Sequence, residues 1–250
     1  MLTAAYQRLT STCPALRVSI SDPTSDPDSP WVRTDRLATS AESLIAFEAA
    51  RIATSHGTAP PTHVAASRLL HHYLWSVALL ISGPWYLEGR VPELRTSDVW
   101  IDPPTGDLTL RPGRSTPGDE STLREAVATH VEPALAAFRP FTKRGQRALW
   151  GMAADDLVSG IWHLARMLGE EARGVEVAAA VLPGGDAGLP GGDAGLPGAA
   201  DFRLLADAAG REHWTRTRVS CCLYYAIEPA ESCLTCPRVC DDERVRRLGV

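Results

Sequence analysis

Residues 142–171 read TKRGQRALWGMAADDLVSGIWHLARMLGEE and form the longest run of regularly spaced apolar residues in the chain. Apolar side chains recur three and four positions apart, which is the spacing of one face of an α-helix. The residues that can share this face are Leu149, Met152, Leu157, Ile161, Leu164 and Leu168. Thr142 supplies a helix start signal. The run therefore predicts a long helix with one buried face.

Three further runs with the same spacing predict helices over residues 40–55, 61–81 and 122–138. Residues 97–101 and 107–110 alternate apolar and polar side chains on either side of the turn sequence PPTG, which predicts a small hairpin, and residues 15–20 predict another strand. Trp85 and Tyr86 follow Gly83-Pro84 and are expected in a turn. The expected fold class is α+β, predominantly helical.

Composition narrows the class of protein. The chain has 250 residues, of which 44% are hydrophobic and 22% charged, with a net charge of −5, so a folded core is expected and disorder is not. Acids outnumber bases, so we expect no nucleic acid as a partner.

The longest strongly apolar stretch, residues 74–81, is much shorter than the roughly 20 residues of a transmembrane helix. The first residues lack the pattern of a secretory signal, which predicts a cytoplasmic protein.

A short repeat divides the chain. The seven residues LPGGDAG at 182–188 recur at 189–195, and LPG begins again at 196. Two and a half copies are too short to build a repeat fold, so a flexible linker is expected. The predicted organisation is a helical body over 1–173, a linker over 174–200 and a compact cysteine-bearing segment over 201–250.

Cysteine is distributed unevenly. Five of six cysteines lie in the last thirty residues, and Cys13 is the sixth. The cluster has the spacing C-C-x10-C-x2-C, formed by Cys221, Cys222, Cys233 and Cys236, and Cys240 follows. In a reducing compartment such a cluster favours metal or redox chemistry over disulfides.

The spacing leaves the type of centre open. Thiolates select zinc, copper(I) or iron–sulfur clusters. Adjacent cysteines on an extended backbone point to opposite sides, which suits a single tetrahedral ion poorly and a larger two-iron centre better. Iron–sulfur, zinc and a metal-free thiol site all remain candidates at this point.

Two other groups of polar residues do not predict a functional site. His63, His71 and His72 lack a metalloenzyme motif, and Asp155 and Asp156 face different ways on a helix, so no catalytic dyad is expected.

The segment Cys221-Cys222-Leu-Tyr-Tyr with Cys233-x-x-Cys236-Pro resembles the cysteine signature of the FhuF-like ferric-siderophore reductases. Residues 79–83 (LLISG) and 149–152 (LWGM) are similar to that family's substrate-binding part only in general character. The resemblance implies that Cys221, Cys222, Cys233 and Cys236 bind one [2Fe-2S] cluster. Cys240 lies outside that pattern and is expected to be either a spare buried thiol or an alternative ligand competing with Cys236, and Cys13 is not expected to be a ligand.

The resemblance also implies an activity, namely one-electron reduction of chelated Fe(III) in the cytosol, with a ferric siderophore as substrate. The electron would come from an external donor, a ferredoxin or a flavin reductase. Transient membrane association is compatible with this role. The alternative is a non-enzymatic protein, stabilised by zinc or a cluster, that binds an iron chelate or a protein partner.

A cluster held by four thiolates is anionic, so nearby cations are of interest. Residues 211–250 carry a net charge of +1, with seven arginines against six acids, whereas the rest of the chain carries −6. Arg216 and Arg218 are candidates to offset the cluster charge or to meet an anionic edge of the substrate. His213 and Trp214 are candidates to line the space between cluster and chelate.

Overall fold

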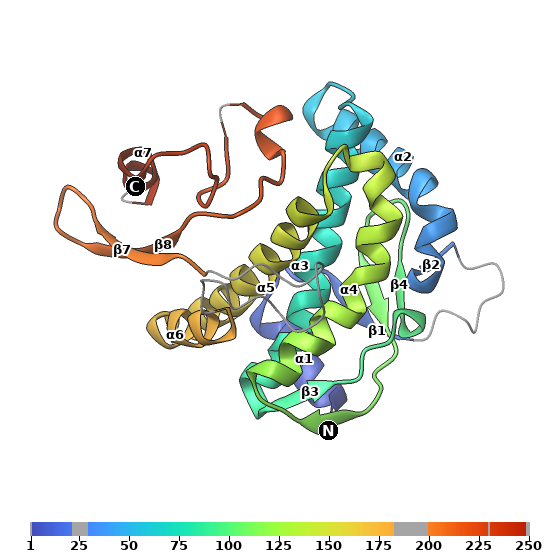
Figure 1. The fold of residues 1–250 in the computed structure, drawn as a ribbon, viewed down its shortest axis with the longest axis horizontal. Coiled ribbons are helices and arrows are strands. Elements are labelled where there is room, and N and C mark those ends of the chain that lie inside the picture. Colours follow the sequence, from blue (N-terminus) through green and yellow to red (C-terminus); the bar gives the residue numbers. More distant parts are fainter. Residues whose placement is uncertain (1, 22–29, 183–199, 230, 249–250) are drawn as a thin grey trace.

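A computed structural model describes residues 2–21, 30–182, 200–229 and 231–248. Figure 1 shows a bundle of helices with a strand-containing C-terminal segment lying along one side of it. The predominantly helical α+β class predicted from the sequence is confirmed.

Helix α3 (Thr62–Glu88) is the centre of the body. It contacts α1 (Leu2–Thr12), α2 (Leu37–His56), α4 (Glu120–Thr142) and α5 (Gln146–Met167), and 18 of its 27 residues are buried. A helix that is apolar on most of its circumference must be covered on all sides. Among the described residues it is the one helix long and apolar enough to cross a membrane, and 78% of its most apolar window is buried inside the protein.

The turn expected at Trp85 and Tyr86 is wrong, because α3 continues through Pro84 to Glu88. Gly83 has a packing role instead. A Cβ atom there would lie 2.7 Å from a methyl carbon of Leu9, so the glycine lets α1 approach α3 closely. The helix ends where Gly89 adopts the left-handed conformation, with φ of 65°.

The predicted hairpin is confirmed. Strands β4 (Val99–Ile101) and β5 (Leu108–Leu110) pair antiparallel, with Val99 opposite Leu110. The predicted strand near residue 20 is β1 (Val18–Ile20), which pairs parallel to β5, and β2 (Val32–Arg33) completes a sheet of order β1-β5-β4-β2. A separate pair, β3 (Arg90–Pro92) and β6 (Ser115–Pro117), runs antiparallel. Short 3-10 helices occupy Thr34–Arg36 and Thr96–Asp98.

Helix α6 (Glu171–Val181) corrects the predicted start of the linker at residue 174. Its buried residues Gly174, Val175, Ala178 and Val181 place it on the body, where it packs against α5. The body therefore extends at least to Val181. Residues 183–199, which hold nearly all of the repeat, lie outside the described residues.

The C-terminal segment begins with a hairpin of β7 (Phe202–Ala206) and β8 (Glu212–Arg216). The chain then returns to the helical body and passes through the 3-10 helix η4 (Tyr224–Ala226) before ending in α7 (Asp241–Leu248). In Figure 1 the hairpin and α7 lie to one side of the bundle, whereas the chain between them reaches across toward α2 and α3. That connecting chain carries the five clustered cysteines, whereas Cys13 lies in the body.

The contact of α6 with α5 leads to a prediction. A Cβ atom added at Gly174 would overlap the Cβ atom of Ala165, which is attached directly to the backbone of α5. We expect Gly174→Ala to lower the free energy of unfolding by about 1–2 kcal/mol, because the overlap outweighs the better helix propensity of alanine. Urea unfolding followed by circular dichroism measures this. The control is Gly145→Ala at the N-cap of α5, where φ is −71° and the space is open, so only the weaker capping by alanine remains and the expected loss is below about 1 kcal/mol.

Candidate functional site

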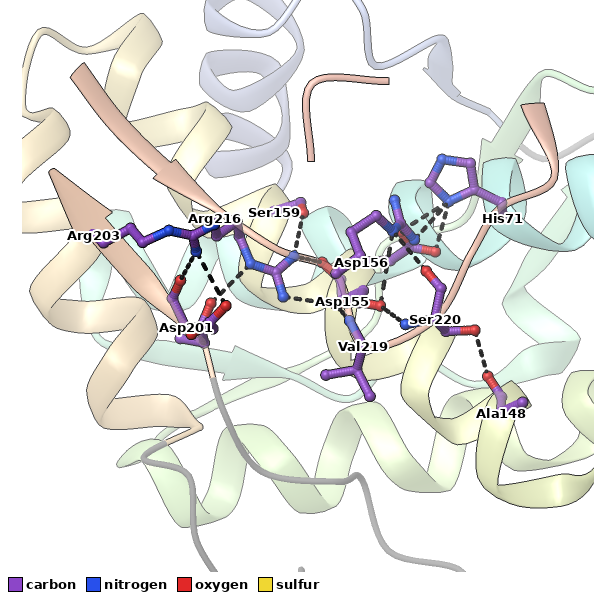
Figure 2. A network of polar contacts seen from close by, with 12 residues as sticks. His71, Ala148, Asp155, Asp156, Ser159, Asp201, Arg203, Arg216, Val219 and Ser220 are labelled. Carbon is purple, nitrogen blue, oxygen red and sulfur yellow. Dashed lines mark hydrogen bonds and ion pairs between the residues drawn. The ribbon is translucent and has the colours of Figure 1, made fainter. Parts of the chain in front are cut away.

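The cysteine segment is attached to the body at one buried carboxylate. Asp155 lies in the middle of α5 with no exposed surface. Its Oδ1 accepts hydrogen bonds from Nη2 of Arg216 at 2.6 Å and the backbone N–H of Val219 at 3.0 Å, and its Oδ2 accepts one from the backbone N–H of Ser220 at 2.8 Å. Figure 2 shows Asp155 between Arg216 on one side and Val219 and Ser220 on the other. The residues that immediately precede Cys221 are therefore fixed by α5.

Asp156, the next residue, forms a second buried contact. Its carboxylate pairs with Nη2 of Arg218 and with Nδ1 of His71, each at 2.8 Å. Burial opposes ionisation of Asp156, but His71 and Arg218 outweigh it and hold its pKa below the usual range. The same pairing, with Asp155 also close, raises the pKa of Arg218 against the opposing effect of burial. Both groups are therefore charged.

These contacts change the interpretation of two predicted residues. The side chain of Arg216 is 0% exposed and also donates to Ser159 Oγ at 3.1 Å and to the carbonyl of Ala200 at 2.9 Å. The expectation that Arg216 faces substrate is wrong, since Asp155 and the packing around it leave no surface to meet a ligand. Arg218 is nearly buried, with an exposed fraction of 6%, and its charge is balanced by the two aspartates.

The predicted ligand cysteines lie in one neighbourhood. The side chains of Cys222 and Cys233 share a hydrogen bond, which lowers the pKa of Cys222 and raises that of Cys233 as the donor. Burial raises the pKa of Cys221, and Cys222 and Cys236 are near enough to raise it further. The structure thus brings together the two halves of the motif, which ten residues separate.

The donor set fits a thiolate-bound centre. Cys222 and Cys236 are buried, and Cys221 and Cys233 are half-buried. Across the described residues, no three His, Cys, Asp or Glu side chains converge closely enough to hold a single ion. Four cysteine thiols are the donor set of structural zinc sites and of [2Fe-2S] centres alike, so the chemistry of these side chains fits either. Cys240 is exposed, so the expectation of a buried thiol is wrong, and Cys13 is fully buried in the core of the body.

A buried arginine outside the motif holds the second half of the cysteine segment. Arg244 on α7 has no exposed surface. Its guanidinium donates to the backbone carbonyls of Leu234 at 2.7 Å, Cys236 at 3.0 Å and Val239 at 3.0 Å. Arg218 adds a backbone hydrogen bond to the carbonyl of Thr235 at 2.9 Å. The turn that bears Cys233 and Cys236 is thereby fixed from both sides.

A second arginine that the sequence did not point to lies beside the first cysteine pair. Arg144, just before α5, donates from Nη1 to Ser220 Oγ at 3.0 Å and bonds the side chain of Cys221. Within the part of the chain that the structure describes, no ion pair joins Arg144 to a carboxylate, whereas Arg216 and Arg218 are both paired. Arg144 is therefore a cation placed to balance negative charge on Cys221, and Arg68 and His71 are near enough to Cys222 to act in the same direction.

His213 and Trp214 lie on β8, in the hairpin. His213 Nε2 bonds the carboxylate of Asp207 at 3.0 Å, and Trp214 is opposite Leu204 on β7. These contacts are internal to the hairpin. A role in lining the space between centre and substrate stays a prediction for both residues.

The match to known proteins falls on the segment just described. Residues 218–238 match the FhuF 2Fe-2S C-terminal domain. We refer to them as the FhuF segment. It contains Cys221, Cys222, Cys233 and Cys236 and ends before Cys240. The family model thus supports a 2Fe-2S centre at this site, and a search of curated proteins found no match. The anchor on Asp155 and the carbonyl contacts of Arg244 involve residues outside the FhuF segment.

Asp155 provides a stability prediction. Replacement by alanine leaves the buried charge of Arg216 and two backbone N–H groups without their acceptor, so Asp155→Ala should lower the free energy of unfolding by about 3–5 kcal/mol. Chemical denaturation of the full chain measures this. The control is Asp201→Asn, which removes a solvent-exposed ion pair with Arg203 and should cost less than about 1 kcal/mol. Similar losses in both variants would contradict the anchoring role of Asp155.

Arg144 provides a redox prediction. Removing a cation beside the thiolates disfavours the more negative reduced state, so Arg144→Gln should make the reduction potential of the bound cluster more negative. Arg144→Lys keeps a positive charge at this position and should leave the reduction potential close to that of the unchanged protein. A potentiometric titration followed by visible absorbance measures the shift. Arg147→Gln, an exposed arginine three residues on, is the control. Equal potentials in Arg144→Gln and Arg147→Gln would show that Arg144 has no such effect.

Proposed function

We propose that this protein is a cytoplasmic ferric-siderophore reductase that transfers one electron to chelated Fe(III) and releases Fe(II). The observation that carries the proposal is the match of residues 218–238, which contain four of the cysteines, to the FhuF 2Fe-2S C-terminal domain. Cys221, Cys222, Cys233 and Cys236 would hold the cluster. When bound, a 2Fe-2S centre supplies an electron carrier that accepts and gives one electron at a time.

The protein residues around the thiols support such a role by limiting movement. Asp155 holds the backbone on one side of the cysteine motif, and Arg244 holds it on the other. Cluster ligands that keep the same positions in the oxidised and reduced states favour fast electron transfer, because the protein around the cluster needs little reorganisation. Arg144 adds a fixed positive charge beside Cys221.

Reduction is sufficient to release the metal. Hard anionic oxygen ligands hold ferric iron much more tightly than ferrous iron, so one added electron weakens the complex while the chelator stays intact. The electron balance is one electron from an external donor, a ferredoxin or a flavin reductase, for each Fe(III) reduced to Fe(II).

Anaerobic mixing tests the proposal. The full-length protein, purified as a coloured 2Fe-2S form, is reduced with dithionite, freed of excess reductant and mixed with different ferric chelates. We expect the visible absorption of the oxidised cluster to return, with one Fe(II) trapped per cluster by a ferrous-specific dye. Cys240→Ser should keep the spectrum and the reaction, whereas Cys233→Ser should lose both.

Two results would contradict the reductase function. The first is a cluster that stays reduced with every chelate. The second is a colourless protein with one zinc and no acid-labile sulfide, which would instead indicate a zinc-stabilised binding protein without reductase activity. Loss of the spectrum in Cys240→Ser and its retention in Cys233→Ser would move the ligand set to Cys240.

A further inference from the structure

The backbone directly after the adjacent cysteines has an uncommon conformation. Leu223 lies in the left-handed region, with φ of 62° and ψ of 14°. Among the described residues, Lys143 and Asp201 are the other two non-glycine residues with a positive φ. A leucine in this region costs free energy, because its Cβ atom crowds the following carbonyl oxygen. Such a conformation persists only where the contacts around it compensate for that cost.

The compensating contacts are made to the two neighbouring sulfurs. The backbone N–H of Leu223 donates to Sγ of Cys221 at 3.4 Å. The backbone N–H of Tyr224, the next residue, bonds the side chain of Cys222. Each donor therefore lies two residues after the sulfur that it meets, and two successive N–H groups serve two successive cysteines.

Both contacts favour the thiolate form of their cysteine. Burial raises the pKa of Cys221, and the N–H of Leu223 is the largest of the effects that oppose it. The pKa of Cys222 is lowered most by its hydrogen bond with Cys233, and the N–H of Tyr224 acts in the same direction. Successive backbone N–H groups that turn to one side form a concave anion-binding site, called a nest. We refer to these two N–H groups as the 223–224 nest.

The 223–224 nest is fixed by contacts that do not involve the cysteines. It opens the 3-10 helix η4, in which the N–H of Ala226 donates to the carbonyl of Leu223 at 3.0 Å. The ring of Tyr224 packs against the helical body on two sides. The guanidinium of Arg68 on α3 lies 5.1 Å from its centroid, and the ring of His56 on α2 meets it edge-on at 6.4 Å. The donors are therefore held in place by the body.

Resting on the proposed function, we propose that Leu223 and Tyr224 are positioning residues whose backbone N–H groups direct the thiolates of Cys221 and Cys222 toward one centre and stabilise the reduced cluster. Adjacent cysteines on an extended backbone point to opposite sides, and the left-handed turn at Leu223 is what brings backbone donors to both. Hydrogen bonds to the sulfurs are among the factors that set the potential of an iron–sulfur cluster, because they offset the charge gained on reduction. The side chain at position 223 acts only through the backbone conformation that it permits.

Tyr224→Pro and Tyr224→Ala test the second donor. Both variants lose the phenol ring and its contacts with the body, but only proline also removes the N–H. Proline suits the first position of a helical turn, and it disfavours the present conformation of Leu223, so both of its effects weaken the 223–224 nest. In a potentiometric titration of the full-length 2Fe-2S protein, we expect a more negative reduction potential for Tyr224→Pro than for Tyr224→Ala. Equal potentials in the two variants would overturn the inference.

Leu223→Gly and Leu223→Val test the backbone conformation. Glycine adopts a positive φ freely, whereas a β-branched residue adopts it only at high cost. We expect Leu223→Gly to keep the potential, and Leu223→Val to make it more negative and to lower the iron and acid-labile sulfide bound per chain. Valine keeps more of the side chain than glycine does, so a role of the side chain itself predicts the opposite order. That opposite order, or equal effects, would contradict the proposal. The matched control is Asp201→Val, which introduces the same strain at φ of 53° and should leave the potential unchanged.

Hydrogen exchange tests the 223–224 nest without using the reductase reaction. Mass spectrometry at single-residue resolution follows the amides of Leu223 and Tyr224 in the full-length protein as purified, whether it carries a cluster or zinc. We expect both amides to exchange slowly, faster in Leu223→Val, and at the original rate in Asp201→Val. Exchange of both amides at the rate of an unfolded chain would overturn the inference, including in the case that Tyr224→Pro does not fold.

The outcomes separate this inference from the reductase function. Protected amides and a potential that follows the conformation of residue 223, together with a cluster that no ferric chelate reoxidises, would support the 223–224 nest and contradict the reductase function. Reoxidation by ferric chelates, with equal potentials in Leu223→Gly and Leu223→Val, would support the reductase function and contradict the 223–224 nest.

Discussion

Two adjacent buried carboxylates, Asp155 and Asp156, are the constraint on which the arrangement of the site depends. Each is 0% exposed, and an ionised carboxylate in the interior is stable only when donors replace the water it has lost. Those donors are Arg216, Arg218 and two backbone N–H groups that precede Cys221, together with His71 on α3. The body therefore cannot bury α5 at low cost until the C-terminal segment has docked. Formation of the cysteine site is thereby coupled to completion of the fold.

The arginines near the thiols have different roles, and the groups that each guanidinium contacts indicate the role of that arginine. Arg216 and Arg218 are balanced by aspartates and act in docking. Arg244 binds backbone carbonyls and shapes the turn between Cys233 and Cys240. Arg144 faces Cys221 and is not paired with a carboxylate within the described residues, so its charge is available to the centre. Proximity in sequence to the cysteines was a poor guide here, because Arg144 is 77 positions away from Cys221 in the chain.

Local patterns predicted most of the elements. The apolar spacing of residues 142–171 corresponds to α5, but the predicted start at Thr142 is wrong, because Thr142 ends α4 and α5 begins at Gln146. The alternation around PPTG corresponds to the β4–β5 hairpin. The errors arose where a tertiary contact decided the outcome. Gly83-Pro84 is a turn signal, yet α3 continues through both residues, and Gly83 packs against Leu9. For Asp155 and Asp156 the sequence predicts no catalytic dyad, because neighbours on a helix point apart. They do diverge, since Asp155 binds Arg216 and Asp156 binds His71, but Arg218 lies close to both carboxylates.

By itself, the sequence determined the helical class, the hairpin and the identity of the cysteine motif, because each depends on residues within about one element of one another. Only the tertiary structure decided which charges are neutralised and which arginine meets the thiols. The partners of Asp155 are 61 to 65 residues away along the chain, and no periodicity or spacing rule acts over that separation. What selects them is the requirement that a carboxylate removed from water be hydrogen-bonded, and this can be seen only once the chain has folded around it.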